Sequence, residues 1–518
     1  MTTVVLVRRF LTDYVRNPVN LLLLALVPTV FVVVAGGSLA DAAELLGGPP
    51  GSSVQTATAG WAAGFLAGIA MFFQTAAMRD TDRRVVIAGI PASQLALARL
   101  LTGACLALLA ATTALVALAA RTGIDSPGRA VAGTLMFAVI YVAIGAGVGS
   151  VVSSPVNGTV IVLFVWMLDV FFGPAMGAAD RLATRGLPTH FVTLWMVDLP
   201  SGHGGRIGDL GWALVTTAVA AVAAWALAAA RSRTAHRKAS RARPGSWLDQ
   251  VGAAWRAAWK DARRNPTLWV LFVLVPVVFI LGATAITPNK PVTFFLAGPG
   301  GLVARTFPMP DVHAATMAPI AIGSLAALTG LFTVLDSRAG DRRAALAGLR
   351  PAALLTARLG VLALAILGVT VVALATTALV FDPERWPIYA AASLLIGVTY
   401  GLIGALLAPV FGRVGGVFVA FLLPFLELGI VQSPLLHATP TTASRLLPGY
   451  GGSRVLLDGA LLRTFDDWAP LLIGVGWLVV LTVAVTVAYR RATRPARTFP
   501  AATVSVPAAG LDAVPAMR

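Results

Sequence analysis

The sequence contains little charge and almost no cysteine. Charged residues make up 12% of the 518 positions, about half the share usual in soluble domains, whereas hydrophobic residues make up 58%. Most of the chain therefore cannot face water. The single cysteine, Cys105, has no partner in the chain, which excludes an internal disulfide, and we expect it to be a small buried apolar residue.

Lysine is also scarce, and the three lysines exclude a standard ATP site. A phosphate-binding loop of the GxxxxGK[ST] type needs a lysine that follows a glycine. None of Lys238, Lys260 and Lys290 follows a glycine. The sequence also contains no metal-ligand spacing, nucleophile triad or dinucleotide-binding loop that supports a site. We therefore predict that this chain has no catalytic, cofactor-binding or metal site and is not an enzyme.

Long apolar runs are abundant. A run of about 20 apolar residues is long enough to cross a bilayer as a helix. Such runs occur at residues 19–37, 59–78, 96–120, 130–152, 158–178, 210–230, 267–286, 317–335, 353–380, 388–410, 414–433 and 469–489. The sequence therefore predicts an all-α polytopic membrane protein with twelve transmembrane helices.

The positive residues are concentrated in a few segments, although the net charge of the whole chain is +17. They cluster between residues 231 and 264 and again after residue 489. Positive segments next to transmembrane helices stay on the cytoplasmic side, so we predict a multi-pass protein of the plasma membrane with both termini inside. Orientation and contact with anionic lipid already account for this charge, so we expect membrane lipid, and no nucleic acid, as a partner.

The chain repeats itself after about 250 residues. The segment RRFLTDYVRNP at Arg8 has a counterpart 248 residues later, and DRRVVIAGI at Asp82 matches DRRAALAGL 259 residues later. The length change falls between these segments, most simply in an outer loop. Each half holds six predicted spans, an even number, so both halves face the same way. We predict a first unit (1–230), a basic cytoplasmic linker (231–250), a second unit (251–490) and a disordered cytoplasmic tail (491–518).

A short stretch before the first span of each half has paired apolar residues that alternate with polar pairs. This period is typical of an amphipathic helix, which with basic residues on its polar face should lie in the headgroup plane. Pro18 and Pro266 suit the first position of the following span, with Asn17 and Asn265 as caps. A plain juxtamembrane anchor is the alternative. The charged residues of this elbow helix are Arg8, Asp13, Arg16, Arg256, Asp261 and Arg264.

The repeated DRR segment reads as a short helix on the cytoplasmic side. Asp82 suits its first turn, and Gly89 is the expected left-handed stop, as are Asp341 and Gly348 in the second half. A helix of about two turns is too short to be stable alone. Mounted rigidly between two spans, it would be a docking site for another protein. An ordinary positive-inside loop is the alternative. The arginines that it would present are Arg83, Arg84, Arg342 and Arg343.

Two acidic residues, Asp169 and Glu427, lie inside predicted spans at corresponding positions of the two halves, one residue out of register. A carboxylate within the membrane is costly, which by default indicates a function. Three interpretations remain open. The carboxylates could attract a cationic substrate, carry a proton, or serve as neutral hydrogen-bond partners between helices.

The elbow helix with its Arg-Asn-Pro exit, followed by a first span and a charged short helix between the second and third of six spans, resembles permeases of the type-2 ABC export class. Two such units in one chain are similar to the tandem permeases of actinobacterial polyketide-antibiotic exporters. The resemblance implies coupling helices at 81–88 and 340–347. It also implies broken, partly re-entrant outer segments at 179–208 and 434–468.

The resemblance implies that the elbow and coupling helices dock on a separate ABC ATPase subunit, with two copies per chain, and that ATP and Mg are held there. The function that follows is the permease of an exporter of an amphipathic or lipophilic compound, such as an antibiotic, a drug or a lipid. The alternative is a proton-coupled secondary transporter of the major facilitator type, which also has 6 + 6 repeats. DSRAGDRR at Asp336 approaches the signature of that family.

Overall fold

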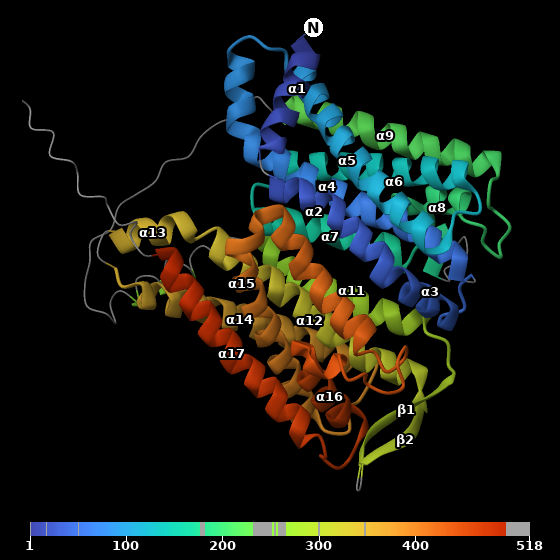
Figure 1. The fold of residues 1–518 in the computed structure, drawn as a ribbon, viewed down its shortest axis with the longest axis vertical. Helices are drawn as coiled ribbons and strands as arrows, with labels where there is room; N and C mark the ends of the chain where they lie inside the picture. The colour runs from blue at the N-terminus through green and yellow to red at the C-terminus, as the bar shows by residue number, and fades with distance from the viewer. Residues whose placement is uncertain are drawn as a thin grey trace, which may run out of the picture.

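A computed structural model describes residues 2–16, 18–49, 51–176, 182–231, 251–252, 255–256, 259, 266–298, 301–346 and 349–493. The chain is mostly helical (Figure 1). The helices of the first half, blue to green in the figure, form one group, and those of the second half, yellow to red, form another beside it. A two-stranded antiparallel sheet lies in the second half, so the predicted all-α class is wrong in this one element.

The first half begins with α1, and α2, η1 and α3 follow as one continuous helical stretch, Pro18–Leu45. Proline opens α2, α6 and α7, where a residue without a backbone donor is tolerated. The elements of this half are α1 (Thr2–Val15), α2 (Pro18–Val30), the π-turn η1 (Phe31–Ala35), α3 (Gly36–Leu45), α4 (Gly51–Ile87), α5 (Ala92–Thr122), α6 (Pro127–Val151), α7 (Pro155–Phe171), η2 (Pro174–Met176), η3 (Leu182–Gly186), α8 (His190–Met196) and α9 (Ile207–Arg231).

The second half follows a similar order, and proline again opens its first span. The elements are α11 (Pro266–Ile286), β1 (Pro291–Gly298), β2 (Gly301–Pro308), α12 (Met309–Leu335), α13 (Arg338–Leu346), α14 (Pro351–Thr377), α15 (Trp386–Leu426), the π-turn η4 (Glu427–Val431), η5 (Ser444–Leu446), α16 (Pro448–Leu461) and α17 (Trp468–Thr493).

Ten helices in the described part of the chain are long and apolar enough to cross a membrane, which supports a multi-pass membrane protein. The sequence analysis predicts twelve spans. The fifth predicted span coincides with α7, which has only 17 residues. The tenth and eleventh lie in one helical stretch, Trp386–Val431, interrupted at Gly412, where φ is 63° and ψ is −154°. The twelve-span arrangement in two repeats stays a prediction.

The two strands form a hairpin, with Phe295 opposite Ala304. The hairpin follows α11, whereas in the first half the short helix α3 occupies the end of the first span. This is the region where the sequence comparison of the two halves places the length change. The buried Phe294 and Leu296 pack on Leu457 of α16, and Arg454 donates to the Phe295 carbonyl at 3.2 Å. The hairpin is thus held by tertiary contacts.

The second and fourth helices of each half approach very closely. Gly145 of α6 faces the backbone of Gly68 in α4, and Gly404 of α15 faces the backbone of Ala327 in α12. Gly145 and Gly404 are 259 residues apart, as are Gly68 and Ala327. Small residues at such contacts let helix backbones approach within the membrane. The two halves therefore share a packing core as well as a sequence pattern.

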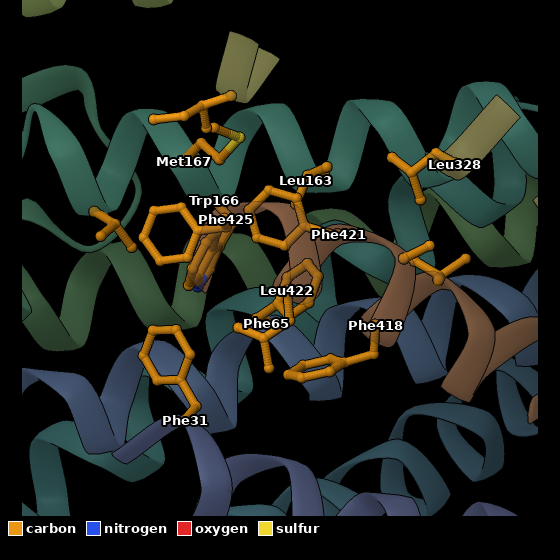
Figure 2. Packing of buried hydrophobic residues seen from close by; sticks show 14 of the residues in the cluster. Phe31, Phe65, Leu163, Trp166, Met167, Leu328, Phe418, Phe421, Leu422 and Phe425 are labelled. Atoms are coloured by element: carbon orange, nitrogen blue, oxygen red, sulfur yellow. The ribbon is translucent and has the colours of Figure 1, made fainter. Parts of the chain in front are cut away.

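Aromatic side chains join the two halves (Figure 2). Phe65 of α4 has its ring centre 5.1 Å from that of Phe418 of α15. Trp166 of α7 meets Phe421 nearly at right angles at 5.8 Å, and Phe421 stacks on Phe425 at 5.9 Å. We call these five residues the aromatic seam. Because their rings are buried between helices of different halves, the seam closes the interface at this level.

Cys105 lies on α5 and is exposed, so the expectation that it is buried is wrong. It is flanked on the same helix by exposed leucines, among them Leu101 and Leu108. A helix that faces lipid can expose small apolar side chains at no cost in hydration. The cysteine belongs to such a face.

Candidate transport and coupling sites

The first DRR segment does not form a separate helix. It is the end of α4, which runs without interruption from Gly51 to Ile87. Met78, Arg79, Asp80 and Thr81 include no residue that ends a helix, so the preceding span simply continues into the segment. The prediction of a two-turn helix that begins near Thr81 is therefore wrong. The predicted stop is confirmed, since Gly89 has a φ of 98°.

The second DRR segment does form its own helix. A turn at Asp336 and Ser337 separates α12 from α13, which has nine residues. The Ser337 hydroxyl donates back to the Thr333 carbonyl at 2.8 Å, and Asp336 pairs with Arg413 of α15 at 2.9 Å. The predicted short helix is therefore confirmed in this half. Gly348, its predicted stop, lies outside the described residues.

The aspartates of the two segments have partners that the sequence analysis missed. Arg99 of α5 holds Asp82 through two hydrogen bonds, of 2.6 and 3.2 Å. Arg358 of α14 holds Asp341 at 2.9 Å. Both arginines lie within the longer repeated stretch, as the Arg of Ala-Arg-Leu, so the repeat itself carried the signal. Each aspartate is thus fastened to the next span.

The arginines that follow these aspartates face away from the bundle. The side chains of Arg84, Arg342 and Arg343 are exposed. Nothing is described for the side chain of Arg83. The exposed arginines form a positively charged surface at the ends of α4 and α13. Their role in docking an ATPase stays a prediction.

The helix α1 has the amphipathic character that the sequence predicts. On its apolar side Leu6, Val7, Phe10, Leu11 and Tyr14 are half-buried, whereas Val4, Val5 and Val15 are exposed. Phe10 lies 3.7 Å beneath the guanidinium of Arg99. Arg8, Asp13 and Arg16 are exposed, and Asp13 pairs with Arg16 at 3.1 Å. The position of α1 in the headgroup plane stays a prediction.

Little of the second predicted elbow helix is described. Arg256 is helical and exposed, and the ring of Trp255 lies against Gly360 of α14. Asp261, Arg264 and Asn265 lie outside the described residues, as does Asn17 of the first half. Most of the predicted linker 231–250 and of the tail 491–518 lies outside them too.

Asp169 is buried near the end of α7 and is held by three hydrogen bonds. The hydroxyl of Tyr141 in α6 donates to it at 2.9 Å. Thr189, the residue before α8, donates its hydroxyl at 2.5 Å and its backbone N–H at 3.2 Å. The carboxylate therefore fastens the start of the short helix α8 to the transmembrane bundle.

Glu427 has an equivalent arrangement in the second half. The hydroxyl of Tyr400 in α15 donates to it at 2.7 Å, and the backbone N–H of Gly449 in α16 donates at 2.5 Å. Tyr141 and Tyr400 are 259 residues apart, in the matching segments YVAIGA and YGLIGA. A carboxylate at the N-terminal end of a helix is favoured by the backbone donors there.

A small cavity of about 110 Å³ lies between the two halves, on the side of α3. Its walls come from α3, α7, α11, α12 and the end of α15. Most lining residues are apolar, and Phe425 of the aromatic seam is one of them. The polar groups in the lining are few: Ser38, His313, Thr316 and Ser433. Neither Asp169 nor Glu427 belongs to the lining.

The segments beyond the spans carry their own charge pairs. Arg129 holds Asp198 with two hydrogen bonds, of 2.8 and 2.7 Å, and this keeps the pKa of Asp198 below its usual value. Asp467, just before α17, is buried close to other carboxylates. Burial raises its pKa to about 6, although the positive charge of Arg454 acts in the opposite direction. The Arg129–Asp198 pair links the start of α6 to the loop after α8.

The described part of the chain holds no group of three or more His, Cys, Asp or Glu side chains that could bind a metal ion. Two helical groups meet at an apolar cavity, and charged helix ends project where a partner could bind.

Part of the chain matches a known protein family. Residues 50–230 match the family described as ABC-2 family transporter protein. The match runs from α4 to α9 and supports a membrane permease of the ABC-2 type, a transport component that works with an ABC ATPase subunit. It does not favour the major facilitator alternative. No curated protein matches the chain.

Proposed function

We propose that this chain is the complete membrane-spanning part of an ATP-driven ABC exporter, with two six-span permease units fused in tandem. The observation that carries the proposal is the match of residues 50–230 to the ABC-2 family, together with the recurrence of the same contacts in the second half. The Asp82–Arg99 pair and its counterpart are 259 residues apart, as are the Gly145 and Gly404 contacts.

The energy source is a separate ABC ATPase subunit, of which two copies bind per chain and hold ATP and Mg. Two arguments support this. The sequence offers no GxxxxGK[ST] loop of its own. Each half carries one exposed basic helix end, at Arg84 in α4 and at Arg342 and Arg343 in α13. We assign these two helix ends, together with α1, as the docking surface for the ATPase.

The cargo is an amphipathic or lipophilic compound, such as an antibiotic, a drug or a lipid. The lining of the cavity between the halves supports this assignment, because it is mostly apolar, with a few isolated hydrogen-bonding groups. A site of this kind favours a ligand that is mostly apolar. Movement of the helix ends by the ATPase would separate the rings of the aromatic seam and extend the cavity toward the cytoplasm.

Asp169 and Glu427 act in this scheme as structural groups. Tyr141 and Thr189 donate hydrogen bonds to Asp169, Tyr400 and Gly449 donate to Glu427, and neither carboxylate lines the cavity. They hold the short outer helices α8 and α16 in place, next to the outer end of the pathway. Both termini lie on the cytoplasmic side of the plasma membrane, as the basic segments around residues 231–264 indicate.

The experiment is co-purification of this chain with a candidate ABC ATPase subunit. The double variant Arg84→Glu and Arg343→Glu reverses the charge of two exposed, repeat-equivalent arginines. We expect it to lower the amount of recovered ATPase about tenfold or more. Exposed charges of one sign at the edge of an interface attract a partner of opposite charge, and the variant reverses them. The matched control is Arg206→Glu with Arg305→Glu, two exposed arginines elsewhere on the molecule.

The control pair should leave recovery of the ATPase unchanged. Full recovery with the Arg84 and Arg343 variant would contradict the assigned docking surface. Vesicle uptake of ethidium and of a fluorescent phospholipid that needs no ATPase and follows a proton gradient would favour the secondary transporter instead.

A further inference from the structure

The two halves contain the same ion pair at the same spacing. Asp82 and Arg99 are 17 residues apart, and so are Asp341 and Arg358. The shift between the two pairs is 259 residues, the shift of the surrounding repeat. In each pair one member is nearly buried: the Arg99 side chain is 7% exposed and the Asp341 side chain 3%.

The pair is retained although the local structure differs between the halves. Asp82 lies within the last turns of α4, a helix of 37 residues. Asp341 lies on α13, a separate helix of nine residues. In both cases the arginine belongs to the next span, α5 or α14. What the duplication has kept is therefore the link between the cytoplasmic helix end and the following span, rather than the shape of the helix end.

Each pair also contacts a third helix. The guanidinium of Arg99 lies 3.7 Å from the ring centre of Phe10 in α1, a cation–π distance. On the other side of the molecule, the hydroxyl of Tyr489 in α17 donates to Asp341 at 2.7 Å. In each half the pair is thus a junction of three helices.

The geometry of these pairs suits the transmission of force. Arg99 binds Asp82 through two guanidinium nitrogens, and such a fork fixes the orientation of both groups. In the second half Asp341 is fixed by two partners instead, one hydrogen bond from Arg358 and one from Tyr489. A buried pair is also costly to break, because either partner would then remain as an uncompensated charge. The exposed arginines next to the aspartates, by contrast, are free to contact another protein.

We propose that Arg99 and Arg358 are positioning residues that couple the helix ends carrying Asp82 and Asp341 to α5 and α14. A displacement of the docked ATPase is thereby transmitted to these two spans. The inference rests on the proposed function, and it assigns the coupling step to two arginines that do not themselves face the ATPase.

The first experiment uses the purified chain alone and tests the pairs without the ATPase. Arg99→Gln and Arg358→Gln should each lower the melting temperature. The exchanges Asp82→Arg with Arg99→Asp, and Asp341→Arg with Arg358→Asp, should restore at least about half of the loss, since they keep opposite charges in contact. Failure of both exchanges to restore any of it would overturn the inference and leave the proposed function intact.

The second experiment uses the complex and follows the aromatic seam. Cysteines replace Phe65 and Phe418 in a Cys105→Ser background, and cross-linking is measured with and without ATP, Mg and vanadate. Arg99→Gln with Arg358→Gln should reduce the nucleotide-dependent change at least about fivefold. The amount of bound ATPase and its hydrolysis of ATP should stay within about twofold of the parent complex. Arg206→Gln with Arg305→Gln, two exposed arginines on other elements, is the control.

Three results would contradict the proposed role of Arg99 and Arg358. A full nucleotide response in the double variant would show that the pairs transmit nothing. Loss of bound ATPase in the same variant would show that the arginines serve docking or folding instead. If the parent complex itself gave no nucleotide response, the proposed function would fail, and this inference with it.

Discussion

The closest backbone contact in each half provides a sharp test of the fold. A Cβ atom added at Gly145 would overlap the carbonyl oxygen of Gly68 and lie 3.0 Å from the backbone nitrogen of Phe72. At Gly404 it would overlap the carbonyl oxygen of Ala327 and lie 2.8 Å from the Cα atom of that residue. The atoms in the way belong to the backbone, so no change of rotamer can relieve the clash.

Two opposing effects set the expected change in the free energy of unfolding. Overpacking of this kind costs about 1–3 kcal/mol. Replacement of glycine by alanine within a helix contributes about 0.5–1 kcal/mol in the other direction. We therefore expect Gly145→Ala and Gly404→Ala each to lower the free energy of unfolding by about 1–2 kcal/mol. The matched control is Gly147→Ala on the same helix, where the nearest atom, Cδ2 of Leu227, is 3.9 Å away.

The assay is thermal unfolding of the purified chain in detergent, followed by the fraction that still elutes as a monodisperse species after heating. Gly145→Ala and Gly404→Ala should both melt at lower temperature than the parent, and Gly147→Ala at the same or a higher temperature. The reasoning is refuted if Gly145→Ala is as stable as Gly147→Ala, because α4 and α6 then cannot be in backbone contact at this point.

Three further predictions use the same assay. Tyr400→Phe removes a donor to the buried Glu427 and should cost about 1–3 kcal/mol; an unchanged melting temperature would contradict the described hydrogen bond. Phe421→Ala removes ring contacts of the aromatic seam and should cost about 3–5 kcal/mol, whereas the exposed Val479→Ala should not. Burial raises the pKa of Asp467 from 3.8 to about 6, so the contribution of this group to stability is present below pH 4 and is lost as the pH rises through about 6. Asp467→Asn should therefore melt above the parent at pH 7 but not at pH 4.

The transmembrane helices follow from local features of the sequence. Apolar runs bounded by proline mark where α2, α11 and α14 begin, at Pro18, Pro266 and Pro351. Both signals act within a few residues, so they need no knowledge of the fold. The same is true of Gly89, whose left-handed conformation ends α4 as expected.

The missed elements depend on contacts between distant residues. The hairpin of β1 and β2 is held by α16, through Leu457 and Arg454, and Arg454 comes 159 residues after its partner Phe295. The end of the second span was misplaced because Thr81 and Asp82 can start a helix but cannot stop one already under way. The predicted burial of Cys105 is wrong because one face of a transmembrane helix contacts lipid. The sequence alone does not show which face of α5 that is.

The candidate sites, too, were predicted where the signal is local and missed where it depends on distant residues. The repeat indicated that Asp82, Asp341, Asp169 and Glu427 belong to duplicated arrangements. Both arginine partners also lie in the repeated stretch, but their pairing with Asp82 and Asp341 was not predicted, because each arginine lies across a turn and on another helix. For Asp169, the tyrosine could have been found in the matching YVAIGA and YGLIGA segments, whereas Thr189 lies in a region with no repeat signal.

The central claim is that one chain supplies both permease units and therefore binds two ATPase subunits. Native mass spectrometry of the complex, purified through a tag on this chain, measures that number directly. The account predicts one copy of this chain with two copies of the ATPase, and one copy fewer when Arg343→Glu or Arg84→Glu alone disables one docking surface. A complex with two copies of this chain and two of the ATPase, or a fully active chain with none, would contradict it.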